Sequence, residues 1–157
     1  MTILLTPRLP TAELPKLTMV GAVALSKAIW QELGLETLIK WPNDLLLEGK
    51  KISGILTELT GELGRVEYLV LGVGINVNQR QEDFPAELGT KAGSLRMAMG
   101  RRIDRLALLR TYLQVFEAEY LTALEEGFSS ILRYCREHSA TLGRWVEIKD
   151  GDRVYYG

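Results

Sequence analysis

Residues 66–73 are mostly apolar, and this stretch limits what the chain can fold into more than any other feature. A strand of this composition is typical of a sheet covered on both faces, because a strand with one solvated face alternates apolar and polar residues. Such a sheet needs a layer of helix packed on it. A helix predicted from about Thr18 to Leu33 supplies that layer, since apolar residues recur on one face at helical spacing. Thr18 is its predicted N-cap, and Gly34 is suited to end it.

Short strands and two further helices complete the predicted framework. The predicted strands lie at 2–5, 37–41, 45–47 and 52–59, and the predicted helices at 103–126 and 128–137. Turns are expected at 48–50 and 61–64, and the polar stretch 79–94 is expected to be a loop. Asp150-Gly151, between two short apolar segments, predicts a final hairpin. The residues therefore predict a sheet with the first helix packed on it.

The composition excludes several classes of protein. The 157 residues suit one ordinary domain, and 19 basic against 20 acidic side chains give a formal net charge of −1. A generic nucleic-acid binder needs a basic surplus, so no nucleic-acid partner is expected. One cysteine, Cys135, and one histidine, His138, exclude an intrachain disulfide and a cysteine-rich or multi-histidine metal site. We expect an inert thiol and a helix cap at these positions.

No apolar run reaches the roughly 18 residues that a membrane span requires. The first residues also lack the basic region and the small-residue cleavage site of a signal peptide. A cytoplasmic protein without a membrane partner is therefore expected.

The segment Lys40-Trp41-Pro42-Asn43-Asp44-Leu45 is the densest group of chemically useful side chains. It places a cation, an amide and a carboxylate at the end of a predicted strand, on a turn that proline stiffens. A nucleotide needs this mixture, because the cation offsets phosphate charge, the amide reads a base or ribose edge, and the carboxylate holds Mg²⁺ or a hydroxyl. The alternative, which spacing alone favours, is that Asn43 and Asp44 only make turn hydrogen bonds while Lys40 is solvated.

A second polar group, Lys50-Lys51-Ile52-Ser53-Gly54, begins the next predicted strand. Adjacent strand residues point to opposite faces, so one lysine faces solvent and the other can face a pocket. Gly54 weakens a strand interior, which indicates that another group approaches the backbone closely. That group is a ligand in one interpretation. In the other, which spacing alone again favours, the glycine marks a bulge or a crossing helix.

The third segment, Gly72-Val73-Gly74-Ile75-Asn76-Val77-Asn78, ends the apolar strand. It lacks the third glycine of a dinucleotide-binding fingerprint and is followed by polar loop, so a Rossmann fold is excluded. The glycines still allow backbone to approach a flat ligand, and Asn76 can pair with an adenine edge. The alternative is a β-bulge that ends the strand.

Taken together, in this order and spacing, the three segments resemble the motifs of biotin–protein ligases, the enzymes that attach biotin to carboxylase carrier proteins. The matching residues are Lys40-Trp41-Pro42-Asn43-Asp44-Leu45, Lys51-Ile52-Ser53-Gly54-Ile55-Leu56 with Glu58-Leu59, and Gly72-Val73-Gly74-Ile75-Asn76-Val77-Asn78. Ser94-Leu95 and Ser139-Ala140-Thr141-Leu142-Gly143 are also similar to family patterns. The resemblance covers nearly the whole chain, and the combination of three motifs is highly specific.

The resemblance implies an α+β fold for residues 1–138, with a mixed β-sheet and packed helices similar to class II aminoacyl-tRNA synthetases. Residues 139–157 would begin a small SH3-like β-domain. The implied reaction has two steps: biotin and ATP give biotinyl-5′-AMP and pyrophosphate, and a lysine of the biotin carboxyl carrier protein of acetyl-CoA carboxylase then accepts biotin. The implied ligands are ATP, Mg²⁺ and biotin.

The resemblance also implies roles for single residues. Lys51 would be the catalytic residue, placed against the biotin carboxylate and the α-phosphate, where it stabilises developing charge. The implied biotin contacts are Lys51, Gly54, Leu56 and Gly72. The implied ATP contacts are Lys40, Asn43, Asp44 and Asn76, and Asp44 is the candidate Mg²⁺ ligand.

The sequence departs from the family pattern at its beginning. It contains no glycine- and arginine-rich loop of the form GRGRxGR, which in the family folds over biotinyl-adenylate, and no N-terminal helix-turn-helix. We therefore expect a chain incomplete for catalysis, an uncovered sheet edge, and oligomerisation or dependence on a second polypeptide that supplies the missing part. Two alternatives stay open. One is a non-catalytic remnant or complementing subunit; the other is a lipoate ligase or transferase, against which the segment at 40–44 favours biotin.

Overall fold

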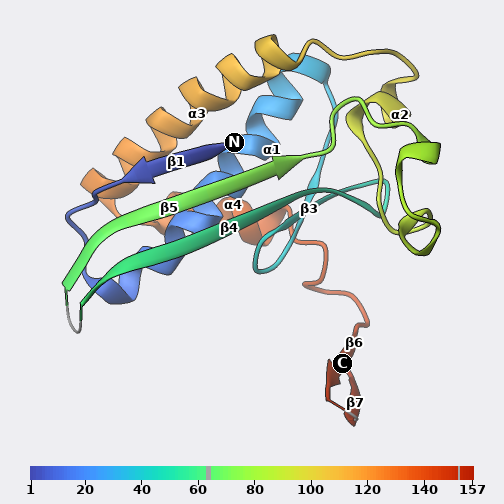
Figure 1. Cartoon of the computed structure of the whole chain (residues 1–157). Coiled ribbons are helices and arrows are strands. Elements are labelled where there is room, and N and C mark those ends of the chain that lie inside the picture. The colour runs from blue at the N-terminus through green and yellow to red at the C-terminus, as the bar shows by residue number, and fades with distance from the viewer. Residues whose placement is uncertain (63–64, 152) are drawn as a thin grey trace.

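A five-stranded sheet is the framework of the protein (Figure 1). The computed structural model describes residues 1–62, 65–151 and 153–157. In spatial order the strands are β1 (Thr2–Leu5), β5 (Arg65–Ile75), β4 (Lys50–Glu62), β3 (Asp44–Leu47) and β2 (Leu38–Lys40). All pairings between these strands are antiparallel. Parallel bonding in the described residues is limited to two isolated bridges, Ile39 with Ser139 and Lys51 with Ala92.

Helices cover one face of this sheet and leave the other open (Figure 1). The helices are α1 (Leu17–Leu33), α2 (Leu95–Met99), α3 (Arg105–Glu126) and α4 (Ser129–Glu137), with single 3-10 turns at Thr11–Lys16, Gln81–Asp83 and Ala86–Leu88. Helix α1 is the central element, because it packs on the sheet with one side and on α3 and α4 with the others. The α+β class expected from the sequence is confirmed.

Helix α1 begins and ends for different physical reasons. Gly34 ends it in the left-handed conformation, with φ 67°, and its N–H donates to the Trp30 carbonyl oxygen over 2.9 Å. This stop was predicted correctly. The predicted N-cap is wrong, because the helix continues directly out of the preceding 3-10 turn and Lys16 occupies the cap position without a side-chain bond. The Thr18 hydroxyl instead lies 2.6 Å from that of Thr57, which ties α1 to β4.

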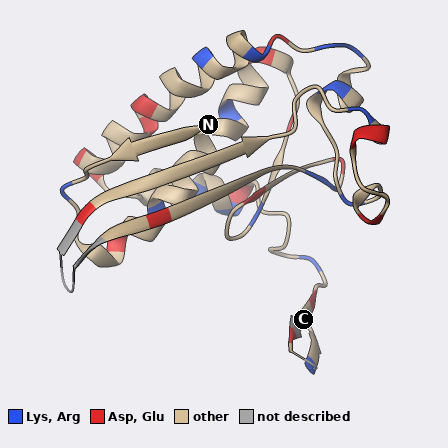
Figure 2. Ribbon diagram, in the orientation of Figure 1, with Lys and Arg blue, Asp and Glu red and all other residues tan. Residues whose placement is uncertain are grey.

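The apolar strand β5 has one buried face only. Leu69, Leu71 and Val73 lie in the core, whereas Val70 and Gly72 are half-buried and Gly74 is exposed. The strand itself was predicted, but its coverage on both faces was wrong. Helix α1 covers the leucine side. The opposite side carries glycines and apolar side chains without a covering helix, and the half of β5 that leads to Ile75 carries no charged residue (Figure 2).

The remaining predicted elements occur close to their expected places. The β3–β4 hairpin turns at Glu48 and Gly49, whose φ angles are 51° and 77°. The long helix and the one after it are α3 and α4. The turn predicted at 61–64 falls partly outside the described residues, and β4 extends to Glu62. Helix α2 was not predicted; its five residues are too few to show a periodic pattern.

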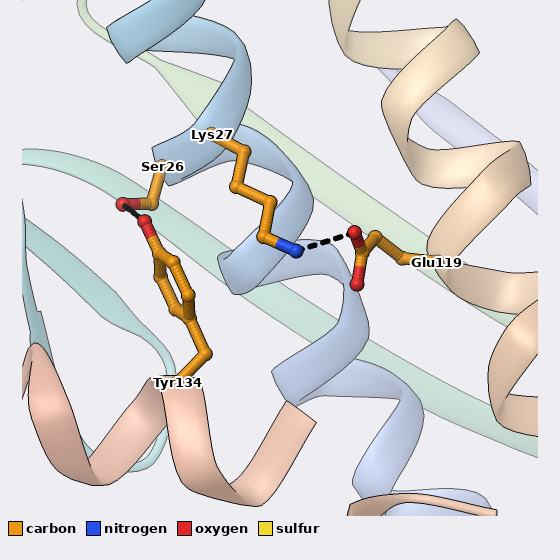
Figure 3. A network of polar contacts seen from close by, with 4 residues as sticks. All are labelled: Ser26, Lys27, Glu119 and Tyr134. Carbon is orange, nitrogen blue, oxygen red and sulfur yellow. Dashed lines mark hydrogen bonds and ion pairs between the residues drawn. The ribbon is translucent and has the colours of Figure 1, made fainter. Parts of the chain in front are cut away.

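A polar network holds α4 and α3 against α1 (Figure 3). The Tyr134 hydroxyl lies 3.0 Å from Ser26 Oγ, which also accepts a 2.9 Å bond from the Thr37 hydroxyl. On the next residue of α1, Lys27 Nζ lies 2.5 Å from Glu119 Oε1 of α3 (Figure 3). A buried hydroxyl on α1 thus has its hydrogen bonds satisfied by the helix and the loop that pack on it.

The final hairpin, β6 (Glu147–Asp150) and β7 (Arg153–Tyr156), stands apart from the sheet in Figure 1. Its pairing confirms the predicted hairpin. The segment that leads to it is hydrogen-bonded to β2, since the Ile39 N–H donates to the His138 carbonyl oxygen and the Ala140 N–H donates to the Ile39 carbonyl oxygen. The division into domains at residue 139 stays a prediction.

Within the described residues, no helix combines the length and the apolar character needed to cross a bilayer.

Tyr112 offers a test of the core. Its hydroxyl is buried and has no hydrogen-bond partner within the described residues, and burial raises the pKa of Tyr112 well above its ordinary value. Tyr112→Phe removes only the unpaired hydroxyl, so the free energy of unfolding should stay constant or rise by up to about 1 kcal/mol. Urea unfolding measures this change.

Tyr134→Phe is the matched control, because the Tyr134 hydroxyl does have a partner in Ser26. It should lower the free energy of unfolding by about 0.5–1.5 kcal/mol. A larger loss for Tyr112→Phe than for Tyr134→Phe would contradict this account of the core.

Candidate functional site

Strand register places four residues in one row across the open face of the sheet. Lys40 of β2 pairs with Asp44 of β3, Asp44 pairs with Gly54 of β4, and Gly54 pairs with Gly74 of β5. Paired residues on neighbouring strands point to the same face, so the row presents a cation, a carboxylate and two bare backbones side by side. All four line a single cavity of about 1080 Å³. Sequence segments separated by more than thirty residues thus form its floor.

Lys51 reaches this row from the start of β4. Its Nζ lies 2.5 Å from Asp44 Oδ1. A Cβ added at Gly54 would lie 3.4 Å from the Lys51 ammonium and 3.6 Å from Asp44 Oδ1, so the missing side chain leaves space beside the pair. The Lys51 side chain is 49% exposed, and an ion pair this accessible contributes about 0–1 kcal/mol to stability. The pair is therefore weakly held.

The backbone of Lys51 is held more firmly than its side chain. Its N–H donates to the Lys91 carbonyl oxygen over 2.8 Å, and its carbonyl oxygen accepts from the Gly93 N–H over 2.9 Å. Segment 91–93 thereby takes the place beside β4 that β5 leaves when it ends at Ile75. A register shift on β4 at this point leaves Ile52 without a partner in β3. The fold thus fixes where the lysine side chain begins.

The loop after β5 forms one wall of the cavity. Its lining residues are Phe84, Leu88, Thr90, Lys91 and Ala92. None of these residues was predicted for the site, because 79–94 showed only the polarity of a loop. The lysine at 91 was the one available signal, and a single charge in a polar stretch does not distinguish a site from a solvated surface.

Two side chains anchor this loop at its ends. The Asn78 amide donates from Nδ2 to the Ile103 carbonyl oxygen and accepts at Oδ1 from the Ile103 N–H, both over 2.9 Å. The Ser94 hydroxyl donates to the Gln79 carbonyl oxygen over 2.7 Å and accepts from the Met97 N–H over 3.2 Å. Ser94 is also the N-cap of α2. The residues between these anchors are therefore held as a closed loop over the sheet.

The structure brings together five of the eight residues nominated from the sequence: the cavity is lined by Lys40, Asp44, Lys51, Gly54 and Asn76. Asn76 is positioned through its backbone, because its N–H donates to the Ile52 carbonyl oxygen over 2.8 Å. Lys51 and Asn76 line the same cavity, and the ligand contacts implied for them stay predictions.

The other three nominated residues do not line this cavity. Leu56 and Gly72 form the next row on the same face, paired with each other and, through Gly72, with Thr2. Leu56 is 58% exposed there, and Leu4 is 65% exposed. Asn43 lies in the turn, where its carbonyl oxygen accepts from the Ile55 N–H over 2.8 Å. The proposed ligand contacts of all three stay predictions.

The charges of the cavity favour an anion. Three lysines, Lys40, Lys51 and Lys91, line it, and Asp44 is the one carboxylate among the lining residues. Ammonium groups beside exposed backbone and a glycine floor can bind a flat, negatively charged ligand. Within the described part of the chain, no three His, Cys, Asp or Glu side chains gather into a metal cluster. A cation here would have Asp44 as its protein ligand, with the ligand's own oxygens completing its shell.

Known proteins are similar to this chain in both sequence and fold. A model of the biotin/lipoate A/B protein ligase family matches residues 1–76. The bifunctional ligase/repressor BirA of Bacillus subtilis is 39% identical over 157 residues, which are 100% of this chain and 48% of that protein. A biotin–[acetyl-CoA-carboxylase] ligase of Paracoccus denitrificans is 29% identical, over 99% of this chain and 66% of that protein. The chain thus spans about half the length of the BirA relative.

Solved structures give the same result. The apo structure of biotin protein ligase from Aquifex aeolicus superimposes with a TM-score of 0.85 at 29% identity, over 99% of this chain and 66% of that chain. The same enzyme in complex with biotin and ATP also has a TM-score of 0.85 at 29% identity, over 99% of this chain and 63% of that chain.

Asn78 tests the anchoring of the loop. Asn78→Ala removes both bonds to Ile103 and leaves a backbone N–H and carbonyl without these partners, so it should lower the free energy of unfolding by about 1–3 kcal/mol. It should also speed proteolysis within 79–94. The exposed amide Gln114 on α3 is the control, since Gln114→Ala should change stability by less than about 0.5 kcal/mol. Equal effects of the two substitutions would exclude the anchoring role.

Cys135 tests the prediction of an inert thiol. It lies half-buried in an apolar groove of about 300 Å³ beside the Trp41-Pro42 turn, and burial raises the pKa of Cys135 to about 11. Below that pKa the reactive thiolate increases about tenfold per pH unit. Alkylation by iodoacetamide should therefore be slow at pH 8 and keep rising through pH 10, whereas free glutathione levels off earlier. A plateau for Cys135 near pH 9 would show an ordinary thiol.

Proposed function

We propose that this chain, which is similar to biotin–protein ligases in sequence and fold, binds biotin and ATP in its cavity and joins them as biotinyl-5′-AMP. The observation that carries this proposal is the row of Lys40, Asp44, Gly54 and Gly74 beneath Lys51. It offers cations for phosphate, a carboxylate for a metal ion, and bare backbone for a flat ligand. One similar protein is a biotin–[acetyl-CoA-carboxylase] ligase, and a solved biotin protein ligase of the same fold holds biotin and ATP together.

In the proposed first step, a carboxylate oxygen of biotin attacks the α-phosphorus of ATP. A new phosphorus–oxygen bond forms, the bond to the bridging oxygen of the β-phosphate breaks, and its electron pair leaves with pyrophosphate. Negative charge develops on the α-phosphoryl oxygens, and an ammonium group stabilises it most where water is excluded. Lys51 suits this role, because its backbone N–H and carbonyl oxygen are both hydrogen-bonded while its side chain can adjust.

In the proposed second step, the neutral amine of a carrier-protein lysine attacks the carbonyl carbon of biotinyl-5′-AMP. The carbon–oxygen bond to AMP breaks, AMP leaves with the electron pair, and the amine gives up a proton as the amide forms. The acceptor we propose is the biotin carboxyl carrier protein of acetyl-CoA carboxylase, since a similar protein is named a biotin–[acetyl-CoA-carboxylase] ligase. We also propose that the protein acts in the cytoplasm.

The two rows on the open face suggest a division of the ligand between them. Lys40, Asp44 and Asn76 line the part of the cavity that we assign to ATP, and Asn43 lies in the turn between Lys40 and Asp44. Gly54, Leu56 and Gly72 continue along the face, where a bare backbone and an apolar side chain suit the ring system of biotin. Mg²⁺ fits the residues present, because it is commonly bound by one or two carboxylates together with substrate phosphates, and Asp44 is such a carboxylate.

Lys51→Ala tests this function. We expect the chain, together with a separate polypeptide that supplies the glycine- and arginine-rich loop, to catalyse biotin- and Mg·ATP-dependent pyrophosphate exchange, and the variant to lose about 10²–10³-fold in rate, the usual cost of removing a group that stabilises transition-state charge. Lys50→Ala is the matched control, because Lys50 is the neighbouring lysine and does not line the cavity. Equal losses in the two variants, or no biotin-dependent exchange by the supplemented wild-type chain, would refute the proposal.

Replacing biotin by lipoate in the same assay tests the substrate. The family description covers both acids, whereas the similar proteins reported above are biotin ligases. We expect exchange with biotin and at least tenfold less with lipoate. The reverse preference would assign the cavity to lipoate.

A further inference from the structure

We propose that Asp44 is the counter-ion of Lys51 in the free site, and that an anionic group of the substrate displaces it. The displaced carboxylate then becomes available to the divalent cation that accompanies the phosphates. This inference rests on the proposed function, because it takes Lys51 as the contact for the substrate anion. Asp44 would thus pair first with Lys51 and then with the divalent cation.

The geometry of the ion pair carries the first part of this inference. Lys51 Nζ and Asp44 Oδ1 are 2.5 Å apart, and Asp44 Oδ1 has no hydrogen-bond partner within the described residues. That oxygen is out of contact with solvent, so the ammonium is what compensates its charge. Losing the lysine to a ligand therefore leaves the carboxylate in need of a second cation.

The exposure of the pair shows that exchange needs no unfolding. The lysine side chain is 49% exposed, whereas its backbone N–H and carbonyl oxygen are both hydrogen-bonded to segment 91–93. Rotation of the side chain alone can release Asp44, and the absence of a side chain at Gly54 leaves room for that rotation. The ion pair thus keeps the Lys51 ammonium near the cavity but allows it to move to a ligand.

The charges around the pair decide which group an incoming anion must compete with. Asp44 is the one carboxylate among the lining residues, and neither Lys40 nor Lys91 forms an ion pair within the described part of the chain. An anion therefore gains these two lysines without competition but must displace Asp44 to reach Lys51. Binding of the anion and of a divalent cation should then be positively coupled, because the anion frees the cation's ligand.

Titration calorimetry with inorganic pyrophosphate at low ionic strength tests both parts. Without Mg²⁺, Asp44→Asn should bind pyrophosphate about 3–10 times more tightly than the wild-type chain, because the competing charge is gone while the side-chain volume is kept. With Mg²⁺ present, affinity should rise more in the wild-type chain than in Asp44→Asn. Glu125→Gln on α3 is the charge-matched control, exposed and outside the cavity, and should behave as wild type.

A double-substitution cycle locates the effect. In a Lys51→Ala background, Asp44→Asn should tighten pyrophosphate binding by a smaller factor, because only the charge repulsion is relieved and the pair that the anion disrupts is absent. Asp44→Ala gives a second variant should Asp44→Asn fail to fold by circular dichroism. Weaker or equal binding in the Asp44 variants, an undiminished effect without Lys51, or no pyrophosphate binding by the wild-type chain would each overturn the inference.

These results separate the inference from the function on which it rests. If pyrophosphate behaves as described and biotin-dependent exchange is absent, the counter-ion exchange stands and the proposed reaction fails. If exchange occurs and the Asp44 variants do not bind pyrophosphate more tightly, the reaction stands and the counter-ion role fails.

Discussion

The register of the antiparallel strands is the constraint on which the rest of this structure depends. A strand shifted by one residue would turn Lys40, Asp44, Gly54 and Gly74 toward the helices and bring core side chains to the open face. Burial prevents such a shift, because Leu45, Ile55 and Val73 alternate with the site residues and lie against the helix layer. The same hydrophobic contacts that hold α1 on the sheet therefore place the polar row in the cavity.

Helix α1 and the loop 79–94 support the site from different sides. Helix α1, tied to β4 through Thr18 and to α4 through Ser26, supports the sheet from behind. The loop anchored by Asn78 and Ser94 forms one wall of the cavity and reaches the backbone of Lys51. Backbone hydrogen bonds fix the position of Lys51, and its ammonium group forms an ion pair with Asp44. This combination of a rigid base and an adjustable side chain suits a group that must follow charge as it moves during a reaction.

The open face of the sheet combines two kinds of surface. Glycines at 54, 72 and 74 leave backbone accessible, and Leu4 and Leu56 add apolar area beside them. An apolar surface without a covering helix is commonly a binding surface in a folded protein. The lack of charged residues in the half of β5 that leads to Ile75 therefore reflects an accessible face suited to a ligand, and not a second layer of helix.

Local sequence determined the elements and the chemistry of this protein, and the tertiary structure decided how they meet. Gly34, the Glu48-Gly49 turn and the periodic helices were predictable because each depends on neighbours in the sequence. The three motifs and their resemblance to biotin–protein ligases could also be recognised from the sequence alone. The Lys51–Asp44 ion pair, the contribution of Lys91 and the pairing of Lys51 with segment 91–93 were not, because they join separate stretches of the chain. Contacts of that kind follow from strand register and packing, which no short window of sequence contains.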